Sequence, residues 1–546
     1  MIAILITLLM LVSTYPLVRL LLGNRRDPVL TWTTTLALSV GLVSLLMLWQ
    51  GLLGILIDWR IAAITAALIS LLGWMIWLPR RQQSANVAPP LNRYEIGALG
   101  IIAVIAVLIL FNATYWPPAI DDAITIYAAF GKQIYRTQIL PQGTLYETYP
   151  MLVPLWYAFV HQVAGQLNEY LAGLIPALLS LGCIGAAYLI GRELQDRRTG
   201  LIAALLVAIT PPFAHWSSTG YVDLPAGFFY ALPVLFLFRW QRDNRPQDAL
   251  LGGIMAGLAL WTKNNTLVLP IIILLWLVYV SLRRKSLPSI RDLLLIFGGI
   301  AVTAGAWYAH TLIMAGVLLP PTAWTDQAQR EITSLFPYLS FGQYSLAGAI
   351  FTPGLLYALW RLLRRKLADR AVIHLLIFYV PFFAAWWLLA SYDPRFLLLL
   401  TPLIAVLAAL LIADLWSNRV IQAVFVIAVV VLSAQSAYIA VDHKTELLRS
   451  PILSDAEKHR IRVGVRYDMA QYINTLPPAR LLTTDILLPY YLDSMTALTG
   501  ELPATADQLI GVEYVVLRPQ DDPLWLADDS PAFEIGGYRL YRLPSR

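Results

Sequence analysis

Long apolar stretches follow one another along most of this chain, separated by short polar segments. A stretch of roughly 20 apolar residues is long enough to cross a hydrocarbon core of about 30 Å. Because a backbone in lipid must satisfy its own hydrogen bonds, these stretches are predicted to be α-helices. A window of roughly 19 residues predicts about fourteen of them, at 2–22, 30–50, 60–78, 96–115, 170–190, 200–218, 222–240, 249–263, 266–282, 292–315, 343–361, 371–391, 396–415 and 418–440.

The pattern changes after residue 440, where charged residues return and long apolar runs stop. A helix-like segment, Val465–Ile473, is followed by a break at Pro477-Pro478. Short β-like segments follow at Leu481–Thr484 and Tyr514–Leu517. The predicted fold class is therefore an all-α polytopic membrane protein with a small C-terminal α/β domain outside the membrane, over 441–546.

The composition agrees with this pattern, since 58% of the 546 residues are hydrophobic and only 13% are charged. Ordinary soluble domains carry about a quarter charged residues, so that class is excluded. The net charge of +6 does not indicate nucleic-acid binding, because the Arg and Lys residues cluster between apolar runs. The single Cys183 cannot form an intramolecular disulfide. No cleavage site follows the first run, so a retained helix is expected there.

Basic residues concentrate in alternate loops, and this predicts the orientation. The rich loops are 24–26, 79–93, 192–198, 239–245, 283–291 and 361–370. The positive-inside rule places them in the cytoplasm. The outer side then holds 116–169, 316–342, everything after 440 and the corners near Asp223, Lys263 and Asp393. The predicted location is the plasma (inner) membrane, with the active site, the C-terminal domain and both termini on the outer side.

The first outer loop opens with two adjacent carboxylates, Asp121 and Asp122, directly after a predicted span. Ionised groups at a membrane boundary are costly unless solvated or paired, so they indicate function. Apolar residues such as Tyr127, Phe130 and Ile134 then recur at helical spacing, which predicts an amphipathic helix on the membrane surface. The alternative is that the two Asp residues only cap this helix.

Further acids and bases lie at other outer corners. Asp223 is the only carboxylate between Thr199 and Arg242, and Lys263 ends an apolar run. Arg395 follows Asp393-Pro394. Each could separately be a helix cap or a snorkelling anchor. Together they place carboxylates beside cations on one predicted face, as transfer from a lipid phosphate would require.

The ordered set of these residues resembles the GT-C superfamily of membrane glycosyltransferases. The similarity is to the branch that includes protein O-mannosyltransferases and aminoarabinose transferases. It rests on Asp121-Asp122, Asp223, the Gly-Leu-Ala-x-x-x-Lys run 257–263 and Arg395, and it covers 96–440. The spans in 1–80 precede the family's usual first helix. After Tyr149-Pro150-Met151-Leu152-Val153-Pro154, His161 comes later than the family pattern implies.

The resemblance implies a GT-C-like catalytic domain over 96–440 that transfers a sugar, with inversion, from a polyprenyl-phosphate donor. The acceptor could be a protein, a lipid or a polysaccharide. Asp121 or Asp122 would take the acceptor proton. Lys263 and Arg395 would hold the phosphate leaving group. The remaining substrate-binding residues implied are Asp223, Tyr127 and His215.

No metal site is predicted, because the six His residues are scattered without a pair at ligand spacing. A divalent metal stays open as an alternative. The chain contains no P-loop or Gly-rich dinucleotide motif, which disfavours a nucleotide-sugar donor. The alternative function is a multi-pass transporter or lipid flippase of cell-envelope precursors, which would be expected to place charges near the bilayer midplane.

Overall fold

The computed structural model describes residues 1–23, 27–78, 90–141, 148–319, 325–339, 342–364, 369–493, 495–505, 508–526 and 530–543. Basic residues of three predicted cytoplasmic loops, at 24–26, 79–89 and 365–368, lie outside these ranges. So do parts of the predicted outer loops 116–169 and 316–342. The chain forms two compact units, and each is described by itself. The first comprises Met1–Thr114 and Phe130–Asp442; the second comprises Tyr115–Ala129 and His443–Arg546.

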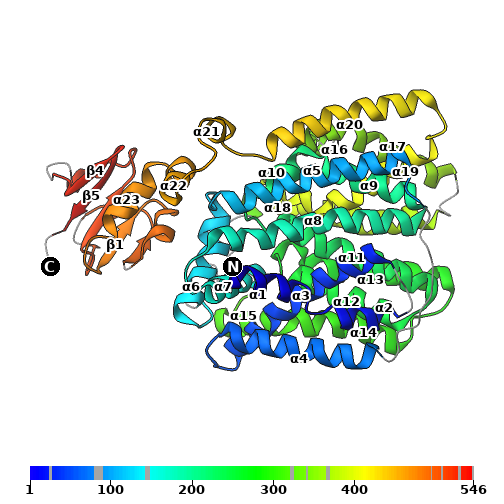
Figure 1. The fold of residues 1–546 in the computed structure, drawn as a ribbon, viewed down its shortest axis with the longest axis horizontal. Helices are drawn as coiled ribbons and strands as arrows, with labels where there is room; N and C mark the ends of the chain where they lie inside the picture. The colour runs from blue at the N-terminus through cyan, green and yellow to red at the C-terminus, as the bar shows by residue number, and fades with distance from the viewer. Residues whose placement is uncertain are drawn as a thin grey trace. The chain divides into compact units, whose positions relative to one another are not determined.

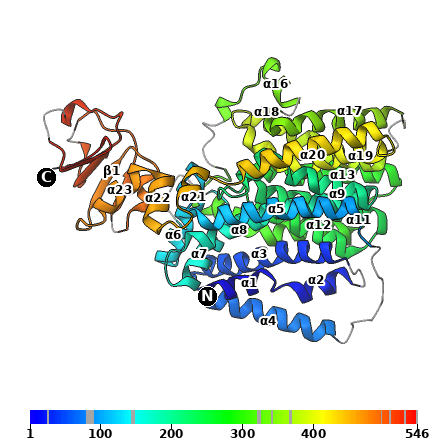
Figure 2. The same cartoon turned by 45° about the horizontal axis from the view of Figure 1, so that its top comes forward.

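The first unit is a bundle of long helices that run side by side (Figure 1). Its helices are α1 (Ile2–Leu11), α2 (Tyr15–Leu22), α3 (Pro28–Leu52), α4 (Trp59–Trp77), α5 (Arg93–Tyr115), α6 (Ala129–Thr137), α7 (Leu152–Ala164), α8 (Glu169–Leu194), α9 (Arg197–Ala208), α10 (Pro211–Trp216), α11 (Asp223–Asp243), α12 (Pro246–Leu260), α13 (Leu269–Arg284), α14 (Ile290–Ile300), α15 (Ala306–Ala315), α16 (Ile332–Leu339), α17 (Gly348–Arg364), α18 (Arg370–Ala390), α19 (Thr401–Asp414) and α20 (Arg419–Ile439). Helices α1–α4 gather along one side of the bundle (Figure 2).

Short irregular helices extend several of these. The segment η3 (Asn264–Val268) leads into α13, and η7 (Pro394–Leu400) leads into α19. The π-helix η4 (Ala301–Gly305) joins α14 to α15, while η5 (Thr325–Gln327) and η6 (Gly342–Ala347) flank α16.

Within the described ranges, 11 helical segments are long and apolar enough to cross a membrane, and they match 11 of the predicted spans. The other three predicted spans differ. The stretch 200–218 is divided into α9 and α10, because Pro211 and Pro212 begin a new helix rather than continue the first. The stretch 249–263 is α12, whose 15 residues rise only about 23 Å.

The third, 222–240, is α11, which has 21 residues but carries Arg239 and Arg242. Most of α11 is buried inside the bundle. A helix surrounded by protein does not need the apolar outer surface that lipid demands. The bundle therefore has an outer layer of helices that face lipid and an inner layer of buried helices. Long apolar stretches in the sequence predict the outer helices better than the inner ones.

Two glycines bring α12 into close contact with its neighbours. A Cβ at Gly253 would collide with the backbone carbonyl of Ile296 on α14, and a Cβ at Gly257 would collide with the Thr303 hydroxyl on η4. Small residues at this spacing allow close approach of membrane helices. The packing fixes the end of α12, just before Lys263.

The second unit contains a five-stranded sheet in the order β2-β1-β3-β5-β4. Its strands are β1 (Arg480–Thr483), β2 (Thr496–Thr499), β3 (Tyr514–Leu517), β4 (Phe533–Ile535) and β5 (Tyr538–Arg542), and its helices are α21 (Lys444–Arg449), α22 (Asp455–Val463), α23 (Val465–Ile473), η8 (Leu488–Tyr491) and η10 (Leu524–Leu526). Strand β1 pairs in parallel with β2 and β3, whereas β5 is antiparallel to β3 and β4. The predicted helix Val465–Ile473 and both predicted strands are confirmed.

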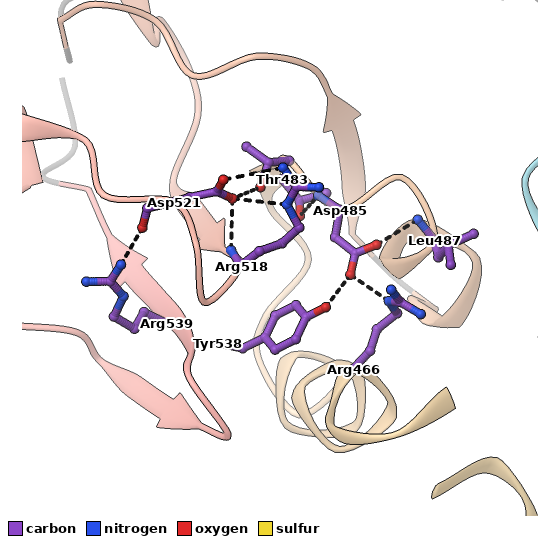
Figure 3. Close-up of polar contacts among 9 residues, drawn as sticks. Arg466, Thr483, Asp485, Leu487, Arg518, Asp521, Tyr538 and Arg539 are labelled. Atoms are coloured by element: carbon purple, nitrogen blue, oxygen red, sulfur yellow. Dashed lines mark hydrogen bonds and ion pairs between the residues drawn. The ribbon is translucent and has the colours of Figure 1, made fainter. Parts of the chain in front are cut away.

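Polar side chains connect the segments that follow β1 and β3 (Figure 3). Asp485 accepts hydrogen bonds from Arg466 Nε at 2.5 Å and from the Tyr538 hydroxyl at 2.6 Å. Burial and this hydrogen bond to Asp485 raise the pKa of Tyr538 to about 12. Asp521, after β3, accepts hydrogen bonds from the hydroxyl of Thr484, after β1, and from the backbone N–H of Arg518 at 3.1 Å. These bonds tie helix, loops and strands of the second unit together.

Candidate functional site

Three of the sequence-predicted residues meet in the first unit. Lys263 Nζ lies 2.5 Å from Asp223 Oδ1, and Arg395 Nε lies 3.6 Å from Asp223 Oδ2. The side chains of Asp223, Lys263 and Arg395 are 1%, 9% and 13% exposed. Two cations that are far apart in sequence therefore share one buried carboxylate.

Each of the three side chains stands at the start of a helical segment. Asp223 begins α11, Lys263 immediately precedes η3, and Arg395 is the second residue of η7. The segments η7 and α11 touch directly, because a Cβ at Gly227 would lie only 2.8 Å from the carbonyl oxygen of Leu399. This close approach brings Arg395 to the first turn of α11, where Asp223 lies.

The Asp223 cluster, made of Asp223, Lys263 and Arg395, combines two cations with one buried carboxylate. A buried ion needs a partner, and Asp223 supplies one to both cations. Two cations and one carboxylate leave a formal charge of +1, which Asp393 balances from the edge at 2.9 Å from Arg395 Nη2 and with 27% exposure. Among the described residues, Asp223 Oδ2 makes no hydrogen bond, since 3.6 Å exceeds that range. Arg395 and Asp223 Oδ2 therefore form an ion pair rather than a hydrogen bond.

Aromatic rings surround the two cations. The Arg395 guanidinium carbon lies 4.0 Å from the centre of the Tyr221 ring and 5.4 Å from that of Trp216. Lys263 Nζ lies 4.3 Å from the centre of the Phe396 ring. Such contacts are favourable cation–π interactions. The sequence does not distinguish these rings from the many other aromatic residues at predicted membrane boundaries.

Two further predicted substrate-binding residues, His215 and Tyr127, and the noted His161 have different surroundings. His215, half-buried at the end of α10, packs its ring 5.0 Å from that of Trp216, which in turn faces Arg395. His161 has a structural role, because its Nδ1 accepts a hydrogen bond from the Asn168 N–H at 3.0 Å. Tyr127 is buried in the second unit.

Asp121 and Asp122 also lie in the second unit, so they are described apart from the Asp223 cluster. They precede η2 (Ala123–Ala128), a π-helix that continues into α6. The predicted surface helix therefore begins with wider turns, a feature often found at functional sites. Asp121 is exposed, and Asp122 occupies the N-cap position without making a side-chain capping hydrogen bond. Helix capping thus does not account for Asp122.

The described residues contain no group of three or more His, Cys, Asp or Glu side chains arranged to hold a metal ion. The carboxylates of Asp223 and Asp393 both face cations.

The chain is similar to known proteins in sequence over part of its length and in fold over most of it. Residues 148–308 match the family described as Dolichyl-phosphate-mannose-protein mannosyltransferase. The fold is similar to that of ArnT from Cupriavidus metallidurans in the apo state, with a TM-score of 0.59 and 16% identity over 82% of this chain and 98% of that chain. The structure of ArnT bound to undecaprenyl phosphate gives the same TM-score and identity over 81% and 97%. No match was found among curated protein sequences.

These findings confirm the resemblance that the ordered motifs predicted. The chain is a multi-span membrane protein with a GT-C fold, and its expected class, glycosyltransferase, is confirmed.

Proposed function

We propose that this GT-C-type membrane glycosyltransferase moves a sugar from a polyprenyl-phosphate donor to an acceptor on the outer face of the plasma membrane, with inversion at the anomeric carbon. The observation that carries the proposal is the buried carboxylate of Asp223 shared by Lys263 and Arg395. A lipid phosphate as the donor's carrier is supported by the ArnT structure that holds undecaprenyl phosphate.

Lys263 and Arg395 bind the phosphate of the donor. As the bond between the anomeric carbon and the phosphate oxygen breaks, negative charge grows on the leaving polyprenyl phosphate. Charge-assisted hydrogen bonds from an ammonium and a guanidinium stabilise that charge more than they stabilise the intact donor. Asp223 positions both cations, and the rings of Trp216 and Tyr221 hold the guanidinium plane of Arg395.

Asp121 or Asp122 takes the proton of the acceptor group as its oxygen or similar atom attacks the anomeric carbon from the face opposite the phosphate. This role rests on their sequence position at the start of the outer loop and on the exposure of Asp121. Tyr127 and His215 contribute to substrate binding.

Donor binding tests the role of the two cations. The purified full-length protein is titrated with undecaprenyl phosphate, and bound lipid is counted by native mass spectrometry. Lys263→Gln and Arg395→Gln should each weaken binding about ten-fold or more, as expected for loss of a charged hydrogen bond.

The matched control for this titration is Arg361→Gln. Arg361 is 9% exposed and bridges two carboxylates, Asp369 at 2.7 Å and Asp414 at 3.0 Å. Its loss should reduce stability without weakening binding. Equal loss of binding in the control and in both site variants would refute the assignment.

Sugar transfer tests the carboxylates separately. Asp121→Asn and Asp122→Asn together should keep undecaprenyl-phosphate binding and lower transfer from labelled donors by roughly 10²- to 10⁴-fold. Asp522→Asn, at an 85% exposed position of the same unit, is the control and should leave transfer unchanged. Transfer that survives in the double variant would show that neither Asp is the base.

A further inference from the structure

An open groove lies on the first unit between α5, α9 and α20, which run side by side in both views (Figures 1 and 2). Its volume is about 800 Å³. Its polar end is formed by the starts of α5 and α9 and by Trp416 just before α20. Helix α5 leads from this end to Asn112, which donates to Ser218 at 2.8 Å, about 28 Å farther along the bundle. The groove thus opens at the end of the bundle remote from the Asp223 cluster.

The walls of the groove are apolar, and its depth is close to the thickness of one membrane leaflet. Ile101 on α5, Leu205 on α9 and Val430 on α20 line it. At 1.5 Å per residue, these positions lie roughly 10 to 16 Å from Arg93, Arg198 and the start of α20. Half of a hydrocarbon core is about 15 Å. The groove therefore has the depth that acyl chains of one leaflet require.

The polar end of the groove, called its rim below, contains two carboxylates that already have partners within the protein. Glu95 lies 3.0 Å from Arg197, and Asp196 caps α9 by accepting from the Thr199 N–H and hydroxyl at 2.8 Å each. The rim carries three arginines and these two carboxylates, so its formal charge is +1.

The remaining rim arginines, Arg93 and Arg198, are exposed. Their guanidinium carbons lie 4.9 Å from the centre of the Tyr94 ring and 5.9 Å from that of the Trp416 ring. Neither arginine pairs with a carboxylate in the part of the chain that the structure describes. Exposed cations and aromatic rings at the mouth of an apolar groove are suited to an anionic lipid headgroup.

We infer that this groove binds an anionic phospholipid of the membrane, with its phosphate between Arg93 and Arg198 and its acyl chains along α5, α9 and α20. The positive rim selects the charge of the headgroup, and the apolar walls match the length of the chains. The site differs from the Asp223 cluster in location and in occupant, and it does not depend on the transfer reaction.

Native mass spectrometry of the purified full-length protein tests this inference with defined lipids. Phosphatidylglycerol should be retained at least about ten-fold better than phosphatidylcholine, because each basic residue near a membrane surface contributes measurably to anionic lipid binding. Arg93→Gln/Arg198→Gln should abolish this preference.

The control pair is Arg283→Gln/Arg364→Gln, which removes two exposed arginines that also lie over rings, Tyr279 at 5.7 Å and Trp360 at 5.0 Å. It should keep the preference. Val426→Trp fills the groove without changing its charge and should lower phosphatidylglycerol retention; it also provides the test if the double arginine variant does not fold.

Three results would overturn the inference. Phosphatidylcholine could be retained as well as phosphatidylglycerol, or the preference could survive in both the Arg93/Arg198 and the Val426→Trp variants. The third result concerns competition with undecaprenyl phosphate. If this lipid displaces phosphatidylglycerol from the wild-type protein but not from the Val426→Trp variant, the donor lipid is the occupant of the groove.

Discussion

Asp223 is the residue through which the two candidate phosphate-binding cations meet, since each of its oxygens faces one of them. Its carboxylate lies in the first turn of α11, where the positive end of the helix favours negative charge. If the ion pairs hold the cluster together, the effects of removing Asp223 and Lys263 should not be independent.

Asp223→Asn leaves Lys263 in a buried position without its counter-ion and should lower the free energy of unfolding by about 3 kcal/mol. Adding Lys263→Met should recover part of this loss, with a coupling of about 1 kcal/mol or more between the two positions. Denaturant unfolding of the full-length protein in micelles measures Asp223→Asn, Lys263→Met and the double variant, which together give the coupling. Simple additivity would mean that the contact contributes little to stability.

At this scale the sequence predicted the polar residues better than the aromatic ones. Asp223, Lys263 and Arg395 were recognisable because charges are rare beside apolar spans. Tyr221 and Phe396 were not distinguishable, because aromatic residues gather at membrane boundaries for reasons unrelated to a site. Their role depends on which helix starts converge, and that is decided by the packing of the bundle.

Among the elements, α12 positions Lys263 through its contact with η4. Gly257→Ala would push a methyl group into Thr303, and the resulting shift should cost about 1 to 3 kcal/mol. Because Lys263 follows the end of α12, undecaprenyl-phosphate binding should weaken as well. Thermal unfolding and lipid titration measure the two effects.

Gly298 provides the control for this variant, because a Cβ there meets no heavy atom within 4 Å. Gly298→Ala on the neighbouring α14 should change stability by no more than about 1 kcal/mol and leave lipid binding unaltered. A Gly257→Ala protein that behaves like Gly298→Ala would contradict the positioning role of α12.

Hydrophobic periodicity predicted the lipid-facing helices and α23, but not every element. Strand β2 is mostly exposed, and the alternation in β4 covers only three residues, too few to indicate a strand. The π-helix η2 was also missed, since a wider turn leaves no mark on amphipathic spacing. The break between α9 and α10 was visible in Pro211-Pro212, although the apolar run continues across it.

In the whole molecule, the second unit should respond to acid through Asp521. Burial alone would raise the pKa of this carboxyl group, but hydrogen bonds from Arg518 and Thr484 outweigh it and hold the pKa below its ordinary value of 3.8. Because the folded pKa is lowered, the stabilisation is present above about pH 3.8 and is lost as the pH falls below it.

Hydrogen exchange of peptides from β3 and the following loop, measured from neutral pH to about pH 3, tests this linkage in the full-length protein. Asp521→Asn should lower protection at neutral pH and flatten its loss in acid. Asp522→Asn, whose side chain is 85% exposed, should keep the wild-type pH dependence. A wild-type profile in Asp521→Asn would show that another group controls the acid response.

In the proposed mechanism, Lys263 and Arg395 hold the phosphate of a polyprenyl-linked donor. A cryo-EM map of the full-length protein with undecaprenyl phosphate tests it most directly. The phosphate should lie within about 3 Å of both Lys263 Nζ and the Arg395 guanidinium, as charged hydrogen bonds require. A phosphate bound elsewhere, with the Lys263–Asp223 pair unchanged and no density beside Arg395, would contradict this mechanism.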